Sequence, residues 1–254
     1  MTVVQFSALN DNYNWIVFCE KTKICAGIDI YNTHTFFEFI KENDLNLVAI
    51  LNTHHHNDHC GGNETIKEKY PDIDFYASKY DYDNKRIPCQ NKFLIEGNLI
   101  NIGEIELQVL ELQGHTLGHI AYFNKDIFFA GDTLFASGCG RVFEGSYEQM
   151  HNSLEKLLKN LEKKTQIYCG HEYTLSNLKF SSSINQEYFK NYFEEISILR
   201  EEELETLPTS LDRELNYNPF LMVFDKDKRE NILNYKNKTS LEAFSDLRDK
   251  KNNF

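Results

Sequence analysis

Apolar residues in the first two thirds of the chain occur in short runs that alternate with helix-like stretches. Four of these runs are rich in Ile, Val and Leu and have the length of buried strands. They are 15–19, 24–30, 47–51 and 105–110. Two more runs, 121–123 and 127–129, flank Asn124-Lys-Asp126 and predict a pair of strands joined by a short turn. The alternation predicts a mixed α and β region over residues 1–173.

Helical spacing of apolar positions predicts helices between these runs and beyond residue 174. The stretch 147–161 places Met150, Leu154, Leu157 and Leu161 on one face. Other helix-like stretches are 33–43, 63–70, 184–203 and 240–251. Strand character fades from Thr174 onward, so residues 174–254 are expected to form a separate helical domain. The run Glu201-Glu-Glu203 is expected to be a solvated helix face.

The heptad Thr53-His-His-His-Asn-Asp-His59 follows directly on the apolar run 47–51 and concentrates metal-ligand side chains. Alternate residues of an extended segment share a face, so His54 and His56 can point one way while His55 points away. Asp58 and His59 follow as the chain bends towards a helix. Imidazole and carboxylate groups suit zinc, iron or manganese. Two pairs of ligands favour two neighbouring metal ions over the alternatives, a His-rich surface loop or one structural zinc site.

Three further candidate ligands have the same setting as the heptad. His115, Asp132 and His171 each follow a β-like stretch and lie beside a glycine. A carboxylate has two oxygens, so Asp132 can bridge two metals. Three ligands for each metal together with the bridge leave room for a shared water.

At this point the motifs resemble those of the metallo-β-lactamase superfamily and, within it, the glyoxalase II (hydroxyacylglutathione hydrolase) family. The resemblance rests on the heptad and on Gly114-His-Thr116, Gly131-Asp-Thr133, Gly138-Cys-Gly-Arg-Val-Phe-Glu-Gly145, Cys169-Gly-His-Glu-Tyr-Thr174, Asn218-Pro-Phe220 and Arg248-Asp-Lys-Lys251. It implies an α+β fold, an αββα metallo-β-lactamase-like sandwich with the metals at one edge. It also implies that the helical domain at 174–254 binds a glutathione thioester.

The resemblance implies hydrolysis of S-(2-hydroxyacyl)glutathiones, above all S-D-lactoylglutathione, to D-lactate and glutathione, the second step of methylglyoxal detoxification. A hydroxide bridging two divalent metals, zinc ahead of iron or manganese, would attack the thioester. The expected ligands are His54, His56 and His115 for one metal and Asp58, His59 and His171 for the other, with Asp132 bridging. Asp58 and Asp132 are the expected catalytic side chains.

Glutathione carries two carboxylates, so an acidic chain must supply local cations. By resemblance the substrate contacts are Arg141, Phe143, Tyr173, Arg248 and Lys251. Phe143 departs from the family, in which several relatives carry Tyr, and can supply only packing and its backbone amide.

The remaining composition restricts the function classes. The net charge of −12 disfavours binding of nucleic acid over the surface. The sequence shows no signal peptide or membrane-spanning run, and its six cysteines form no Cys-x-x-Cys pair. A monomeric cytoplasmic enzyme with free thiols is therefore expected. His55 and His119 are expected to pack beside the site, and His34 and His151 to be solvated.

Two rival hypotheses remain open from the sequence. A persulfide dioxygenase has the same fold and a similar His-rich motif, but binds one iron through fewer ligands. The basic segment Arg248–Lys251 argues against it. A non-enzymatic metal-binding module would not account for an open site with a bridging carboxylate.

Overall fold

The structure, a computed structural model, describes all 254 residues and divides into two compact units. Unit 1 comprises Met1–Glu111, Leu117–Asn124 and Phe128–Gly131, and unit 2 comprises Leu112–Thr116, Lys125–Ile127 and Asp132–Phe254. The expected domain boundary at residue 173 stays a prediction, because neither unit begins or ends at that residue.

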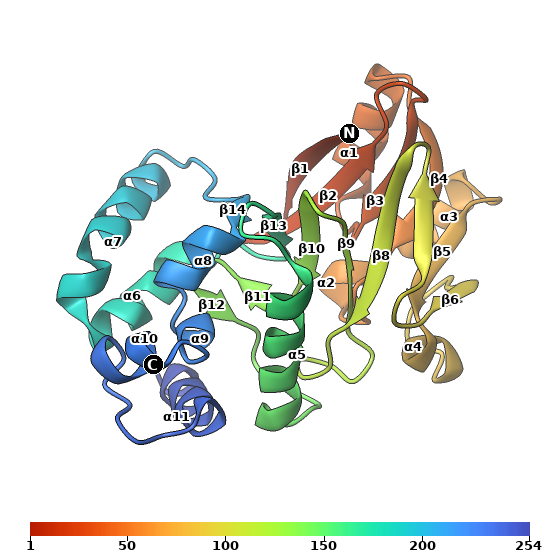
Figure 1. Cartoon of the computed structure of the whole chain (residues 1–254). Helices are drawn as coiled ribbons and strands as arrows, with labels where there is room; N and C mark the ends of the chain where they lie inside the picture. Colours follow the sequence, from red (N-terminus) through yellow and green to blue (C-terminus); the bar gives the residue numbers. More distant parts are fainter. The chain divides into compact units, whose positions relative to one another are not determined.

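Unit 1 contains one complete six-stranded sheet, four strands of a second sheet, and the helices between the strands of the first (Figure 1). Its elements are β1 (Thr2–Ala8), β2 (Asn12–Phe18), β3 (Ile24–Ile28), α1 (Thr33–Glu42), β4 (Asn46–Leu51), α2 (Asn57–Cys60), α3 (Asn63–Lys69), β5 (Asp74–Ser78), α4 (Lys79–Asp83), β6 (Lys92–Leu94), β7 (Leu99–Ile102), β8 (Ile105–Glu111), β9 (Ile120–Phe123) and β10 (Ile127–Gly131), whose first residue belongs to unit 2.

The first sheet has the strand order β1-β2-β3-β4-β5-β6. Its first three strands are antiparallel, and β3 to β6 run parallel. Helices α1 and α3 cover one face, where Phe36, Ile40 and Ile66 pack against Phe18 and Phe75. Because parallel strands end at the same edge, the residues that follow β3, β4 and β5 meet there.

The second set of strands in unit 1 is an antiparallel meander, β7-β8-β9-β10. The pairing of Phe128 with Phe123 confirms the strand pair expected around Asn124-Lys-Asp126. Residues at the end of β4 touch this meander. The amide of Ile120 donates to the carbonyl of Thr53 at 2.9 Å, and the hydroxyl of Tyr122 donates to the carbonyl of Asn52 at 2.7 Å. The edge at which β4 ends is thus fixed from both sheets.

Unit 2 is mostly helical. Its elements are β11 (Leu134–Phe135), β12 (Gly138–Cys139), α5 (Tyr147–Asn160), β13 (Gln166–Cys169), α6 (Thr174–Ile184), α7 (Gln186–Glu201), β14 (Thr209–Ser210), α8 (Leu211–Tyr217), α9 (Pro219–Met222), α10 (Lys226–Asn231) and α11 (Ser240–Asn252). Capping boxes begin α5 at Ser146 and α11 at Thr239.

The helix expected over 184–203 is present as α7, Gln186–Glu201, which is two residues shorter at each end. The preceding helix, α6, ends at Ile184. Asn185 separates them, and its side chain accepts from the amide of Tyr188 as the cap of α7. The sequence pattern missed α6, whose apolar face is weak because serines occupy three consecutive positions near its end.

Candidate metal centre

The heptad leaves the carboxyl end of β4 and turns into α2. His54 is fully buried, and its Nε2 lies 3.0 Å from Nδ1 of His56. Two imidazole ligands of one tetrahedral ion would lie about 3.3 Å apart, so this pair needs little movement to share a metal. Asp58 and His59 lie on α2, with Oδ2 and Nε2 3.5 Å apart. The structure thus brings each expected pair of the heptad together.

A buried carboxylate that the sequence analysis missed orients this group. Asp29 follows β3, and its Oδ2 accepts from Nδ1 of His59 at 3.0 Å. The same carboxylate accepts from the amide of Thr53 at 2.8 Å and from its hydroxyl at 2.7 Å. Because the Thr53 hydroxyl gives its proton to Asp29, its oxygen must accept from Nδ1 of His54, 3.0 Å away. Asp29 therefore orients both histidines through their Nδ1 side, so that Nε2 of each points towards the rest of the ligand group.

Three further polar side chains contact residues of the heptad. Asn12 donates from Nδ2 to Oδ2 of Asp58 at 2.8 Å. His119 is buried and stacks on His54 at 5.0 Å between ring centroids, which agrees with its expected packing role. His55 contacts the guanidinium of Arg86 at 2.9 Å from Nδ1.

The ligands expected outside the heptad form a second group, in unit 2. Asp132 is buried, and its Oδ2 lies 3.4 Å from Nε2 of His115 and 3.4 Å from Nε2 of His171. Nδ1 of His115 donates to the carbonyl of Arg141 at 2.8 Å. This hydrogen bond occupies Nδ1 and leaves Nε2 as the nitrogen that faces Asp132. Oδ2 of Asp132 is thus equidistant from the two imidazoles.

Aromatic rings surround this second group. Tyr173 stacks on His171 with ring centroids 4.6 Å apart, and Phe135 packs edge-on against both rings. Phe143 lies 5.3 Å from the ring of His115 and is 60% exposed. The guanidinium of Arg141 lies 5.5 Å from the Phe143 ring. Exposed Phe143 and Arg141 are therefore available for contact with a substrate.

The two basic residues expected from α11 differ in their surroundings. Arg248 is buried, and its Nη1 donates to the carbonyl of Cys139 at 2.9 Å. Lys251 donates to the carbonyl of Ser176 at 3.2 Å and lies over the rings of Phe180 and Phe254. Burial lowers the pKa of Lys251 to about 8. Arg248 thus has a structural contact, whereas Lys251 is the more exposed cation.

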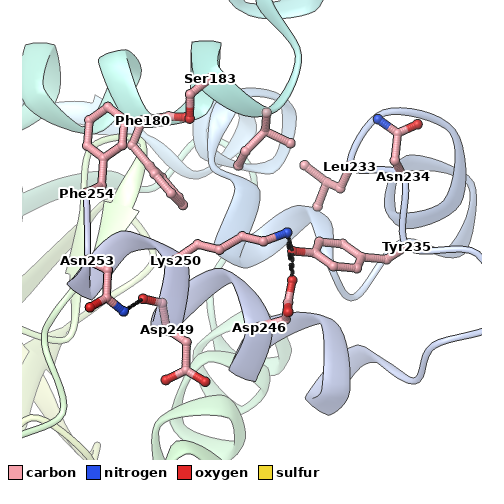
Figure 2. A pocket seen from close by; sticks show the side chains of 11 residues that line it. Phe180, Ser183, Leu233, Asn234, Tyr235, Asp246, Asp249, Lys250, Asn253 and Phe254 are labelled. Atoms are coloured by element: carbon pink, nitrogen blue, oxygen red, sulfur yellow. Dashed lines mark hydrogen bonds and ion pairs between the residues drawn. The ribbon is translucent and has the colours of Figure 1, made fainter.

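Lys250, next in sequence to Lys251, is held by other residues. It lines a pocket of about 660 Å³ beside α6 and α11 (Figure 2). Its Nζ is paired with Asp246 at 2.8 Å and lies 3.1 Å from the hydroxyl oxygen of Tyr235 (Figure 2). Only Lys251 of the two lysines therefore carries a charge without a carboxylate partner.

The thiols of the chain and the ring of His151 lie in mostly buried surroundings. All six cysteines are free, and burial raises the pKa of Cys60, Cys139 and Cys169. These three thiols are therefore poor nucleophiles at neutral pH. The expectation that His151 is solvated is wrong. Its ring is buried against Phe224, since it lies on the inner face of α5.

Comparisons with known proteins identify the family. Residues 31–171 match the model of the metallo-β-lactamase superfamily, and residues 172–254 match that of the hydroxyacylglutathione hydrolase C-terminus. Proteins named hydroxyacylglutathione hydrolase from Pectobacterium atrosepticum and Nostoc punctiforme are 39% and 37% identical to the chain, with full coverage of both partners in each case.

Solved structures agree on the fold. ETHE1 from Myxococcus xanthus matches with a TM-score of 0.69 and 22% identity over all of both chains. A protein solved in a di-iron-bound form (TTHA1623) matches with a TM-score of 0.61 and 23% identity, over 87% of this chain and all of that one. The expected α+β metallo-β-lactamase fold with a C-terminal helical region is confirmed. No helix is long and apolar enough to cross a membrane.

The superfamily match and the histidine and carboxylate groups together show that the chain binds divalent metal. The full-length relatives at well above 30% identity and the two adjoining family models all agree. The chain therefore belongs to the hydroxyacylglutathione hydrolase family of the metallo-β-lactamase superfamily.

Proposed function

We propose that the protein hydrolyses S-(2-hydroxyacyl)glutathione thioesters, above all S-D-lactoylglutathione, to the 2-hydroxy acid and glutathione. The observation that carries this proposal is the full-length match to relatives named hydroxyacylglutathione hydrolase. The C-terminal family model covers the region in which Lys251 lies, as a substrate-binding part requires. We further propose that the protein acts as a monomer with two zinc ions.

The donor set fits two such ions. Every proposed ligand offers an imidazole nitrogen or a carboxylate oxygen, which are the donors zinc accepts in open catalytic sites. One ion would be held by His54, His56 and His115 and the other by Asp58, His59 and His171, and Asp132 would contribute its carboxylate to the site. Asp29 and the Arg141 carbonyl hold His59 and His115 by Nδ1, so that Nε2 is presented. When bound, such ions lower the pKa of a water molecule and polarise a carbonyl group.

The side chains of the protein have defined tasks in the reaction. Water attacks the thioester carbonyl carbon, the C–S bond breaks, and glutathione leaves as a thiolate that takes up a proton. Asp58, held by Asn12, is placed to accept the proton that the attacking water releases. Asp132, whose Oδ2 lies 3.4 Å from Nε2 of His115 and of His171, would bind metal together with these two histidines. Water is the nucleophile, so no serine or cysteine nucleophile is needed. The nearby thiols Cys60 and Cys139 are also poor nucleophiles, because burial raises their pKa values.

Substrate recognition is assigned to the exposed cations and rings of unit 2. Lys251 and Arg141 would pair with the carboxylates of glutathione. Nη1 of Arg248 is occupied by the Cys139 carbonyl, so Arg248 would use Nη2. Tyr173 and Phe143 would supply packing surfaces beside the histidines.

The test is hydrolysis of S-D-lactoylglutathione by the purified protein, followed as formation of D-lactate and free thiol, with metal content measured on the same sample. A D-lactoyl thioester of N-acetylcysteamine, which lacks the glutathione carboxylates, is expected to be a much poorer substrate. His54→Ala should abolish hydrolysis, whereas His34→Ala, at a solvent-exposed histidine of α1, should leave it unchanged. Oxygen uptake with glutathione persulfide and no thioester hydrolysis would reject the proposal.

A further inference from the structure

The turn between β11 and β12 lacks the local interactions that would make it rigid. Its ladder consists of two residue pairs, Leu134 with Cys139 and Phe135 with Gly138. A two-stranded hairpin is marginal in water even when it is longer. Ser137 at its tip has φ +56, a left-handed conformation that is uncommon for a residue with a side chain. Interactions from elsewhere must therefore hold this turn.

Two buried polar side chains of the α8–α9 region bind the backbone of the turn. Oε2 of Glu214 accepts from the amide of Ser137 at 2.7 Å, a contact across 77 residues of sequence. Nδ2 of Asn218 donates to the carbonyls of Phe135 and Gly138 at 3.1 and 2.8 Å. It also donates to Oε2 of Glu214 at 3.0 Å, so the two side chains act as one unit.

Two other helices bind the same turn. Asn177 of α6 donates to the carbonyl of Ala136 at 3.0 Å, and Arg248 of α11 donates to that of Cys139 at 2.9 Å. Outside its short ladder, the backbone of residues 135–139 thus receives hydrogen bonds from side chains that lie 41 or more residues further along the chain.

The turn leads directly into the contacts that place two proposed metal ligands. The amide of Gly140 donates to the carbonyl of Thr133 at 3.2 Å. A Cβ at Gly140 would lie 1.9 Å from the carbonyl oxygen of Asp132 and 3.3 Å from Nδ1 of His115, so the backbone passes close to both ligands. Arg141 then accepts from Nδ1 of His115. A shift of the turn would move the acceptor on which the orientation of His115 depends.

The position of Glu214 is energetically unfavourable for a charged carboxylate. It is fully buried, and burial raises its pKa to about 7. Three donors offset that cost, since Oε1 accepts from the hydroxyl of Thr209 at 2.8 Å while Oε2 serves Ser137 and Asn218. An apolar side chain would fill the same volume without a desolvation cost. The carboxylate is therefore explained by the donors that it binds.

We propose that Glu214 is a positioning residue for His115 and Asp132, which it orients through the backbone of residues 137–141. The proposal rests on the proposed function, in which both residues bind metal. It adds a residue of the helical region that touches neither metal nor substrate.

The decisive comparison is between Glu214→Leu and Glu214→Gln. The Gln carbonyl can accept from Ser137 and Asn218 while its amide donates to Thr209, so Gln should keep metal affinity and kcat within about threefold of wild type. Leu offers no acceptor and should weaken zinc binding about 10- to 100-fold, the usual effect of losing a group that orients a ligand. With Leu, kcat should fall at least about 10-fold, and KM should rise as well, because Arg141 lies on the backbone segment that shifts.

The matched control is Asn185→Ala, which removes a cap and a hydrogen bond to Ile232 from the same unit without touching the turn. It should lower thermal stability and leave zinc affinity and kcat unchanged. If Glu214→Leu binds zinc and turns over substrate like Asn185→Ala, the proposal is overturned.

A second variant covers the case in which Glu214→Leu does not fold. Asn218→Ser keeps an oxygen to cap α9 but cannot reach the carbonyls of Phe135 and Gly138. It should weaken zinc binding in the same direction, and unchanged zinc affinity would contradict the proposal. Zinc affinity is read by chelator competition, without substrate. If the wild type binds zinc but hydrolyses no glutathione thioester, only the proposed function fails, and the zinc measurements still decide the role of Glu214.

Discussion

Asp29 and His59, 30 residues apart in sequence, share a buried hydrogen bond of 3.0 Å. Asp29 also binds Thr53, and through that hydroxyl it sets the orientation of His54. A single carboxylate at the end of β3 thus selects the nitrogen that each of two histidines presents. Asp29 therefore acts on the proposed ligands by orienting their rings and is not itself one of the proposed ligands.

Asp29→Asn is expected to weaken metal binding about 10- to 100-fold, because the amide cannot accept from His59 and Thr53 with both of its ends. Chelator competition with zinc measures the change. Asp83→Asn, at an exposed carboxylate of α4, is the matched control and should have no effect. Equal zinc affinity of the two variants would show that Asp29 does not orient the histidines.

Asp132→Ala is expected to abolish thioester hydrolysis and to reduce the bound metal below two ions per chain. Oδ2 of Asp132 lies at the same distance from His115 and His171, so loss of the carboxylate should affect metal binding by both histidines. Hydrolysis and elemental analysis are measured together, with exposed Asp72→Ala as the control. Full activity with two metals retained would count decisively against a bridging role.

Lys251→Ala is expected to raise KM for S-D-lactoylglutathione about 10-fold, the effect of about 1.4 kcal/mol, while kcat stays within about threefold. Lys250→Ala is the matched control, because Lys250 is bound by Asp246 and Tyr235. Equal KM values for the two variants would remove Lys251 from the substrate site.

The KM of the wild type should also depend on pH. Burial lowers the pKa of Lys251 to about 8, so its charge is present below that pH and is lost above it. KM should therefore rise between about pH 7.5 and pH 9. This rise should disappear in Lys251→Ala. A rise that persists in the variant would belong to another group.

The free energy of unfolding should depend on pH because of Glu214. Its folded-state pKa of about 7 lies above the usual value for Glu of about 4.3, so between these values the folded protein holds a proton that the unfolded chain has lost. The contribution of Glu214 to stability therefore falls as pH rises from about 4.5 to about 7, by up to roughly 3 kcal/mol. Denaturant unfolding of Glu214→Gln should lack this component, whereas exposed Glu68→Gln should follow the wild type. Parallel pH profiles for wild type and Glu214→Gln would contradict the assignment.

The proposed ligands could be found from the sequence because each directly follows an apolar strand or lies beside a glycine. In the heptad, local geometry is enough, since alternation and the start of α2 pair His54 with His56 and Asp58 with His59. The fold class followed from the motif resemblance and from the alternation of strands and helices.

Residues that act at long range could not be found in this way. Glu214 carries no signal in the sequence, and Asn218 stands out only as part of the motif Asn218-Pro-Phe220, without a role. Only the folded chain brings them to a turn some 80 residues earlier. Asp29 did carry a signal, because it also follows directly on an apolar strand. His151 was misjudged, since a helical histidine can face the core when a hydroxyl such as that of Ser240 binds its nitrogen.

The burial of the thiols has a practical consequence for handling the protein. Cys25, Cys60, Cys139 and Cys169 are buried, and each has a raised pKa, so little thiolate is present at neutral pH. Oxidants and alkylating agents react with exposed thiolates. These four sulfur atoms should therefore survive purification in air. Cys19 is the exception, because a hydrogen bond from Thr22 lowers its pKa to about 7, so metal loading calls for a reductant that is not itself a thiol.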